Sequence, residues 1–255
     1  MTAPDWNSLS ERLIKALRPV AAPLAITFSP ERPEDVPAFD EPLAEPTDDG
    51  RTGRVPAGCV FWIKAGERTF STVAEDRGNC SVGSLTHGLK TLEEAAEGAD
   101  VATLLESGWV AEEVFPHIPV VPEKPGAITY GPLAETPIEP DVVLLRINPY
   151  AGMVLSDALA DLKVEGKPQC HIVAMAKEGQ IAFSIGCALS RARTGMQATE
   201  MTGAIPARRL AEVLDKVEYT SKIDMMARGT LGKTLAAFNL GLGERIDCGL
   251  AFEPF

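Results

Sequence analysis

The sequence is short of basic residues, and this shortage argues against several classes of partner. It has 24 lysines and arginines against 36 aspartates and glutamates, which gives a net charge of -12 and an isoelectric point near 4.8. Such an acidic protein repels phosphate backbones and anionic lipid headgroups. We therefore expect no nucleic acid and no membrane surface as a partner.

Long apolar runs are also missing. No uninterrupted stretch reaches the roughly 18 apolar residues that a membrane-spanning helix needs. The first residues, MTAPDWNSLSERL, have neither the basic lead nor the apolar core of a secretory signal. The sequence therefore predicts a cytoplasmic protein.

Three common catalytic or nucleotide-binding motifs are incomplete or absent. The stretch ARGTLGKT, residues 227–234, has Ala227 where a P-loop needs its first glycine. The stretch GLGERI, residues 241–246, lacks the last glycine of a dinucleotide fingerprint. No serine stands in the G-x-S-x-G setting of a nucleophile elbow. We therefore expect no P-loop, no dinucleotide fingerprint and no serine triad.

Cysteine is scarce, and its number is odd: Cys59, Cys80, Cys170, Cys187 and Cys248. A reducing cytosol does not usually maintain structural disulfides, so each thiol is either a small buried side chain or a chemical group. The close C-x-x-C spacing that marks many zinc sites is absent. The sequence gives no role for Cys248.

An apolar pattern typical of a globular protein is present over most of the 255 residues. We expect a first half over residues 1–110, a connection over 111–140, and a second half over 141–255 that ends in a helical segment. The two halves could also pack as one compact domain. Residues 29–58 are rich in proline and acidic residues and predict a long loop or lid.

Two stretches of the chain resemble each other. CVFWIKAGERTFS starts at Cys59, CHIVAMAKEGQIAFS starts at Cys170, and each predicts a β-hairpin that ends in Phe-Ser. Before them, the expected strand LAITFSP, residues 24–30, matches VLLRINP, residues 143–149. After them come two expected helix starts, and four pairs align there without a gap: Cys80 with Cys187, Gly88 with Gly195, Leu89 with Met196, and Glu93 with Glu200.

From these matches we infer a degenerate internal duplication. The predicted fold class is α/β (α+β), with two similar halves that each contain a strand, a β-hairpin and a helix. Duplicated units of this kind often pack about a pseudo-twofold axis with the site at the seam. That packing would bring four thiols towards one place: Cys59, Cys80, Cys170 and Cys187.

These four cysteines are the candidate metal ligands. At a helix start, backbone N–H groups and the helix dipole stabilise an anion, so we expect lowered pKa values at Cys80 and Cys187. Four thiolates could hold a metal ion or an iron–sulfur cluster, with His87 and His171 as nitrogen alternatives. The leading hypothesis is a site that binds a metal or redox cofactor in a protein that could be an enzyme.

Two other interpretations stay open. GNCSVGS and SIGCALSR place Ser81 and Gly186 beside helix starts, where backbone N–H groups could hold an anion clamped by Arg191 or Arg193. This predicts a metal-free module that binds or senses a small anionic ligand. Alternatively, Cys80 or Cys187 could be the nucleophile of an enzyme. The apolar hairpins could also build the interface of a homo-oligomer.

The same residues resemble a known family. The segments PLAITF, CVFWIKAG, NCSVGSLTHGL, GCALSRARTG and AIPARRLAEVL look like the bacterial and archaeal family called domain of unknown function 169. The resemblance extends from about residue 10 to about residue 220. Its motifs are Cys59 itself, the element of Asn79, Cys80 and Gly83, and the element of Gly186, Cys187 and Arg191. The resemblance supports the importance of these positions and implies no particular reaction.

Overall fold

The computed structural model describes residues 4–40, 59–76, 80–188, 190–191 and 196–237, with the backbone alone for 231–237. Within them, strands from both halves of the chain form one mixed sheet in the order β2-β3-β1-β4-β7-β6-β5. Neighbouring strands are antiparallel except for β5 and β6. The strands are β1 (Leu24–Ser29), β2 (Phe70–Thr72), β3 (Ala127–Pro132), β4 (Val142–Ile147), β5 (Lys163–Glu165), β6 (Ala182–Ser184) and β7 (Met201–Pro206).

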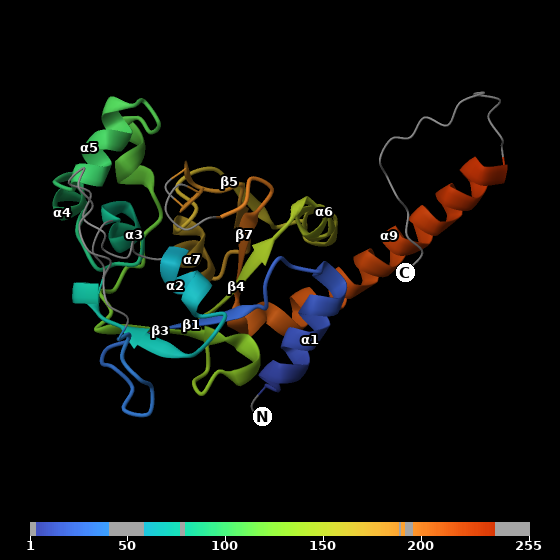
Figure 1. Cartoon of the computed structure of the whole chain (residues 1–255), viewed down its shortest axis with the longest axis horizontal. Helices are drawn as coiled ribbons and strands as arrows, with labels where there is room; N and C mark the ends of the chain where they lie inside the picture. Colours follow the sequence, from blue (N-terminus) through green and yellow to red (C-terminus); the bar gives the residue numbers. More distant parts are fainter. Residues whose placement is uncertain (1–3, 41–58, 77–79, 189, 192–195, 238–255) are drawn as a thin grey trace.

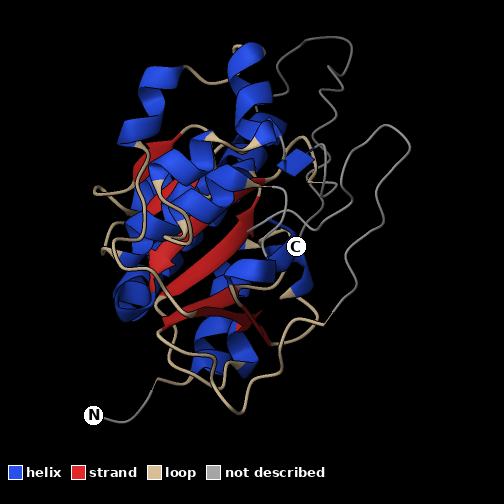
Figure 2. Ribbon diagram, turned by 90° about the vertical axis from the view of Figure 1, so that its left-hand side faces the viewer, coloured by secondary structure: helices blue, strands red, loops and turns tan. Residues whose placement is uncertain are grey.

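Helices cover both faces of this sheet (Figures 1 and 2). One face packs against α2 (Cys59–Lys64), α3 (Ser81–Thr86), α4 (Leu92–Ala96), α5 (Ala99–Glu106) and α7 (His171–Lys177). The other packs against α1 (Trp6–Leu17), α6 (Pro149–Ala158) and α9 (Leu210–Ala237). Four 3-10 turns lie between these elements: η1 (Ala74–Asp76), η2 (Glu112–His117), η3 (Leu133–Glu135) and η4 (Ala207–Arg209). The predicted α+β class is therefore confirmed.

Side chains along the central strands point alternately to the two faces of the sheet, and this creates two separate cores. In β4, Val142 and Leu144 point to the face that also buries Cys170, whereas Val143 and Leu145 point to the opposite face. Successive strand residues point to opposite sides, so a strand buried on both sides reads as a continuous apolar run. We call the first side the cysteine face and the second the aliphatic face.

The aliphatic face is closed by the two terminal helices. Asp5 caps α1, since its carboxylate accepts a hydrogen bond from the Ser8 amide at 3.1 Å. Arg12 then joins α1 to α9 through Asp215 and Glu218, both at 2.9 Å. Beyond these contacts α9 extends away from the body of the protein (Figure 1).

The two predicted β-hairpins are wrong in their first arms. The segment beginning at Cys59 forms the helix α2 before β2, and the segment after Cys170 forms the helix α7 before β6. A short apolar run fits a buried helix as well as a buried strand, and periodicity alone does not separate them. In α2, Phe61 and Trp62 are almost fully enclosed by the cysteine face.

The expected connection over 111–140 also needs correction, because it contains β3. This strand pairs with β1 over six residues and with β2 over three, so it lies inside the sheet. Its sequence, AITYGP, is apolar on the cysteine face through Ile128 and Tyr130, but it lies in the proline-rich segment that was predicted to be only a connection.

The strand order reads the same way outward from the central pair. From β1 come β3 and β2, and from β4 come β7 and β6, with β5 added at the edge. A duplication would give this order, but the duplication itself stays a prediction. The Phe-Ser match does not describe equivalent places, because Phe70 packs on the cysteine face and Phe183 on the aliphatic face.

The first part of the expected lid is attached to the edge of the sheet. The Phe39 amide donates to the Ser71 carbonyl at 2.8 Å, and the Phe39 ring meets the Phe61 ring edge-on, with 5.0 Å between the ring centres. The rest of the segment, residues 41–58, lies outside the described residues.

Candidate functional site around four buried cysteines

The four predicted ligands all stand at the start of helical segments. Cys59 is the first residue of α2, while Cys80 and Cys170 are the N-caps of α3 and α7. The carbonyl of Cys187 accepts the amide of Arg191 at 3.1 Å, as in the first turn of a helix. Cys248 lies outside the described residues.

These thiols act on one another electrostatically. Besides burial, Cys187 raises the pKa of Cys59, and Cys170 raises the pKa of Cys80. The pKa of Cys170 is in turn raised by Cys59 and Cys187. In the described part of the chain, no three His, Cys, Asp or Glu side chains are grouped so that they could share one metal ion.

Burial is the largest influence on the pKa values of Cys59, Cys80 and Cys170, and it keeps these three thiols protonated. It raises the pKa of Cys59 to about 11 and that of Cys80 well above its usual value, although the Gly83 amide donates to the Cys80 Sγ at 3.3 Å. The lowered pKa expected for Cys80 is therefore wrong. Its helix is short, and desolvation of a thiolate outweighs one backbone hydrogen bond.

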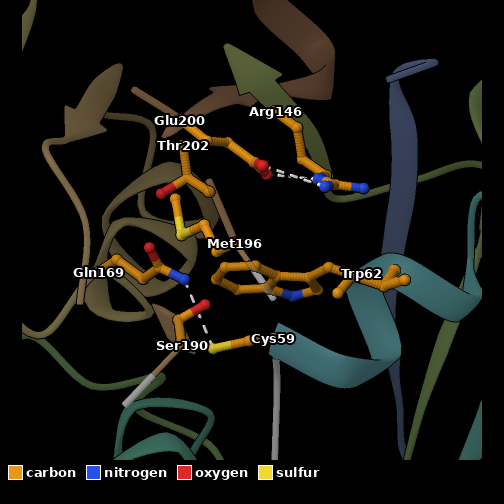
Figure 3. Close-up of a pocket in the computed structure, with 9 residues that line it drawn as sticks. Cys59, Trp62, Arg146, Gln169, Ser190, Met196, Glu200 and Thr202 are labelled. Carbon is orange, nitrogen blue, oxygen red and sulfur yellow. Dashed lines mark hydrogen bonds and ion pairs between the residues drawn. The ribbon is translucent and has the colours of Figure 1, made fainter. Parts of the chain in front are cut away.

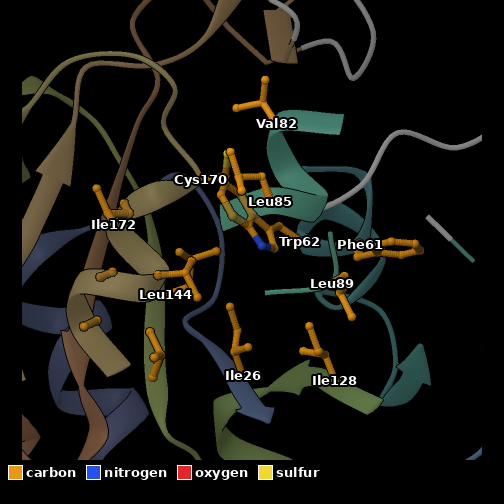
Figure 4. Packing of buried hydrophobic residues seen from close by; sticks show 14 of the residues in the cluster. Ile26, Phe61, Trp62, Val82, Leu85, Leu89, Ile128, Leu144, Cys170 and Ile172 are labelled. Atoms are coloured by element: carbon orange, nitrogen blue, oxygen red, sulfur yellow. The ribbon is translucent and has the colours of Figure 1, made fainter. Parts of the chain in front are cut away.

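Apolar side chains surround the thiols on the cysteine face. In Figure 4, Cys170 lies beside Leu85 and Trp62, with Val82 nearby on the same side. Cys80, Cys170 and Cys187 are 5–7% exposed, and Cys59 is half-buried. Cys59 is thus the member of the group most open to solvent.

The residues around α3 hold the helix in place. The Asp100 carboxylate accepts the Ser81 amide at 2.8 Å, so the start of α3 is capped from α5. His87 is fully buried, and its Nδ1 lies 2.8 Å from the Gly83 carbonyl oxygen. Both predicted site residues therefore contribute to the packing around Cys80.

Arg191 packs against Gly186 in the segment after β6. The Arg191 Nη2 donates to the carbonyl oxygens of Ile185 at 3.1 Å and Glu200 at 3.0 Å, and more distantly to Ala198. Gly186 has a φ of +130°, and a Cβ there would clash with the Arg191 Nη1. The guanidinium thus binds backbone carbonyls. Arg193 lies outside the described residues.

His171 is bound to an acid on the neighbouring β5. Its Nε2 lies 3.1 Å from the Glu165 Oε2, while its buried Nδ1 has no hydrogen-bond partner. Burial lowers the pKa of His171, and Glu165 opposes that shift in part.

A small cavity opens beside Cys59, between α2 and the strands β4 and β7 (Figure 3). Its inner space is about 10 Å³, and with its open mouth it reaches about 220 Å³. The lining residues are Cys59, Trp62, Ile63, Arg146, Gln169, Ser190, Met196, Glu200 and Thr202.

An ion pair between Arg146 and Glu200 forms part of the cavity wall. Arg146 donates from Nε and Nη2 to the two carboxylate oxygens of Glu200, at 2.5 and 3.1 Å. Glu200 is 2% exposed, so the pair is largely withdrawn from water. Such bidentate pairing fixes both side chains in direction.

Two further polar groups border the same space. The Gln169 Nε2 donates to the Cys59 Sγ at 3.4 Å, while its Oε1 is buried without a partner. The Thr202 hydroxyl is likewise buried and unpartnered, and Thr202 pairs directly with Arg146 across the sheet. Sequence reasoning missed Arg146, Gln169 and Thr202 as site residues. The one available signal was the neighbouring Cys170 for Gln169.

Together, the fold and the site define an α+β protein with buried, mutually interacting thiols and a polar cavity at one of them. The model of the family DUF169, described as uncharacterised ArCR, matches residues 12–216, so the chain belongs to this family. No curated protein and no solved structure matches the chain. Among the described helices, none has the length and apolarity needed to cross a bilayer.

Proposed function

We propose that the protein binds a thiolate-ligated redox cofactor of the iron–sulfur class at Cys59, Cys80, Cys170 and Cys187. The observation that carries this proposal is the mutual electrostatic influence of buried thiols from four separate helical segments. Single buried cysteines are common core residues. Several that converge from both halves of a chain are better explained by a common ligand.

A cluster suits the arrangement better than a single ion does. Four sulfurs around one zinc, each at about 2.3 Å, lie roughly 3.8 Å apart in a tetrahedron. No such close group occurs among the described residues. In a [4Fe–4S] cluster each thiolate binds its own iron, so the sulfurs stand farther apart while still sharing one charge centre.

The raised pKa values fit this role once the cofactor's charge is considered. A buried thiolate without a partner is costly, which keeps Cys59 and Cys80 neutral. Iron would replace the thiol protons and supply the opposing positive charge, so loading should release protons. The apolar surroundings, including Trp62 and Leu85, would shield the cofactor from water and influence its potential.

The two other interpretations have less support. An anion clamp needs a guanidinium directed at the ligand, whereas Arg191 binds backbone carbonyls. A cysteine nucleophile needs a thiolate near neutral pH, whereas burial raises the pKa of Cys80. Binding of a small anionic ligand stays a prediction, and so does nucleophilic catalysis by Cys187.

The test compares Cys170→Ser with Ile172→Val, a matched change at a neighbouring position of α7 that is also buried. Both proteins are purified without oxygen and without a polyhistidine tag, and their iron, sulfide and visible absorbance are measured. We expect Cys170→Ser to lose most of the iron and the visible absorbance, and Ile172→Val to keep both. Equal iron content in the two variants, at the wild-type level, would contradict the proposal.

A further inference from the structure

Three buried polar atoms without a hydrogen-bond partner belong to residues that line the cavity at Cys59, namely Gln169 Oε1, Thr202 Oγ1 and the donor Trp62 Nε1. Gln169 Oε1 is an acceptor without a partner, and Thr202 Oγ1 can accept or donate. Glu200 adds two carboxylate oxygens that keep unused lone pairs after binding Arg146. Gln169 and Thr202 are each 1% exposed, so these atoms cannot turn to bulk water.

Buried polar groups without partners are uncommon and call for an explanation. Leaving such a group unsatisfied costs about 1–3 kcal/mol. In Figure 3 the Gln169 amide and the Thr202 hydroxyl lie on the same wall, beside Met196. A group that donates two hydrogen bonds could satisfy both oxygens together.

The charge of the cavity disfavours an anion. Glu200 is almost fully buried, and the two nitrogens that Arg146 directs at it are occupied. The pair is neutral as a whole, so the cavity offers no excess positive charge. A negative ligand would meet the oxygens of Gln169 and Glu200 at close range, where like charges and dipoles repel.

The size of the cavity limits the ligand. The inner space of about 10 Å³ admits roughly one water-sized group. The rest of the volume, up to about 220 Å³, includes the open mouth beside Trp62, Ile63 and Met196, so only the donor end of a ligand enters the inner space.

We propose that this cavity binds a small uncharged molecule through its N–H or O–H donors, beside Cys59. A primary amide or a short alcohol has the required chemistry. The inference rests on the proposed function in one respect, namely that the bound molecule would then lie next to the cofactor on its most exposed side.

The experiment uses acetamide and acetate, which have the same size and shape but differ in charge and in donors. Each is titrated into the full chain while the side-chain N–H signals of Trp62 and Gln169 are followed by NMR, after assignment with Trp62→Phe and Gln169→Glu. We expect acetamide to shift both signals to saturation. Acetate should leave them unchanged at the same concentrations.

Thr202→Val and Thr129→Val form a matched pair for this test. Both threonines are buried in the sheet with unpartnered hydroxyls, but Thr129 is on β3 and does not line the cavity. We expect Thr202→Val to weaken acetamide binding about tenfold, the effect of about one hydrogen bond. Thr129→Val should bind acetamide as the wild type does.

Three results would overturn the inference: acetate binding as tight as acetamide, equal effects of the two valine variants, or shifts that never saturate. Iron is measured on the same samples, and the titration is repeated after iron removal by a chelator. Iron without an acetamide response refutes this inference alone. A saturable, Thr202-dependent response in a protein that never holds iron refutes the proposed cofactor alone.

Discussion

The two faces of the sheet both bury continuous apolar clusters, but Cys59, Cys170 and the small cavity lie on one of them. On the aliphatic face, the buried Ser221 hydroxyl donates to the Ala16 carbonyl at 3.0 Å and also meets the Tyr150 hydroxyl at 3.3 Å. On the cysteine face, Gln169 Oε1 and Thr202 Oγ1 have no partner. The Ser221 hydroxyl is satisfied within the fold, whereas the two oxygens at the cavity are open to a ligand.

This contrast suggests that the two faces of the sheet have different roles, one in stability and the other in ligand binding. Residues such as Leu145 and Leu214 on the aliphatic face are fully buried among other hydrocarbon side chains and contribute stability. The thiols and unpartnered oxygens of the cysteine face are costly to bury without a ligand. Strained or unsatisfied groups gather at functional sites when the rest of a fold compensates for them.

The largest expected effect comes from the aliphatic face. Leu214→Ala removes a fully buried side chain from α9 and should lower the free energy of unfolding by about 2–5 kcal/mol. Iron content per folded chain should stay at the wild-type level. Urea unfolding and metal analysis on the same preparation measure both quantities. Loss of iron from the folded variant would contradict the idea that the aliphatic face contributes stability alone.

A smaller loss of stability is expected for Gly186→Ala. The added Cβ would meet the Arg191 guanidinium at a φ that favours glycine, so we expect a cost of about 1–3 kcal/mol. Because Cys187 follows directly, this variant should also lose iron. Gly108→Ala is the control, because Gly108 also has a positive φ but nothing lies near its Cβ. We expect this variant to keep its iron. If both variants kept their iron, the close packing of Gly186 against Arg191 would have no role in holding the cofactor.

Protonation of His171 should make the stability of the fold depend on pH. The pKa of His171 is lowered in the fold, so below its ordinary value of about 6.5 the unfolded chain binds the proton more readily. The free energy of unfolding should therefore fall as the pH drops below about 6.5. His171→Gln should flatten this slope in denaturant titrations, and His117→Gln, an exposed control, should not. An unchanged slope in His171→Gln would contradict the assignment.

The smallest effect concerns the ion pairs at the rim of the aliphatic face. Arg12→Gln removes the bonds to Asp215 and Glu218, which are partly exposed, so we expect a loss of about 0.5–1 kcal/mol. The hydrogen bond from Arg12 is the main cause of the lowered pKa of Glu218. The difference from wild type should shrink in high salt. Lys15→Gln on the same helix is the charge control, and an equal salt response in both variants would argue against the pair.

The sequence predicted the strands that are continuous apolar runs and missed those with weaker signals. LAITF and VVLLRI became β1 and β4 because such runs suit strands buried on both sides. CVFWIK has the same character but lies between other helices on the cysteine face, where tertiary packing made it α2. The strand β3 was hidden by its proline-rich surroundings.

The candidate site was predictable in part for similar reasons. Cysteines are few, so their recurrence pointed to Cys59 and Cys170 without any structure. Arg146 and Thr202 are ordinary polar residues in apolar strands, and they meet only through the pairing of β4 with β7. The raised pKa values followed from burial depth, which neither helix position nor spacing reveals.

The most direct test of the central claim is iron and sulfide analysis with a visible spectrum, on wild-type protein purified without oxygen or tag. A cluster bound by the four cysteines predicts iron and acid-labile sulfide in fixed proportion to the chain, with absorbance that fades on reduction. A colourless protein that stays free of iron even after anaerobic reconstitution would contradict it, and would leave the four cysteines as members of the core.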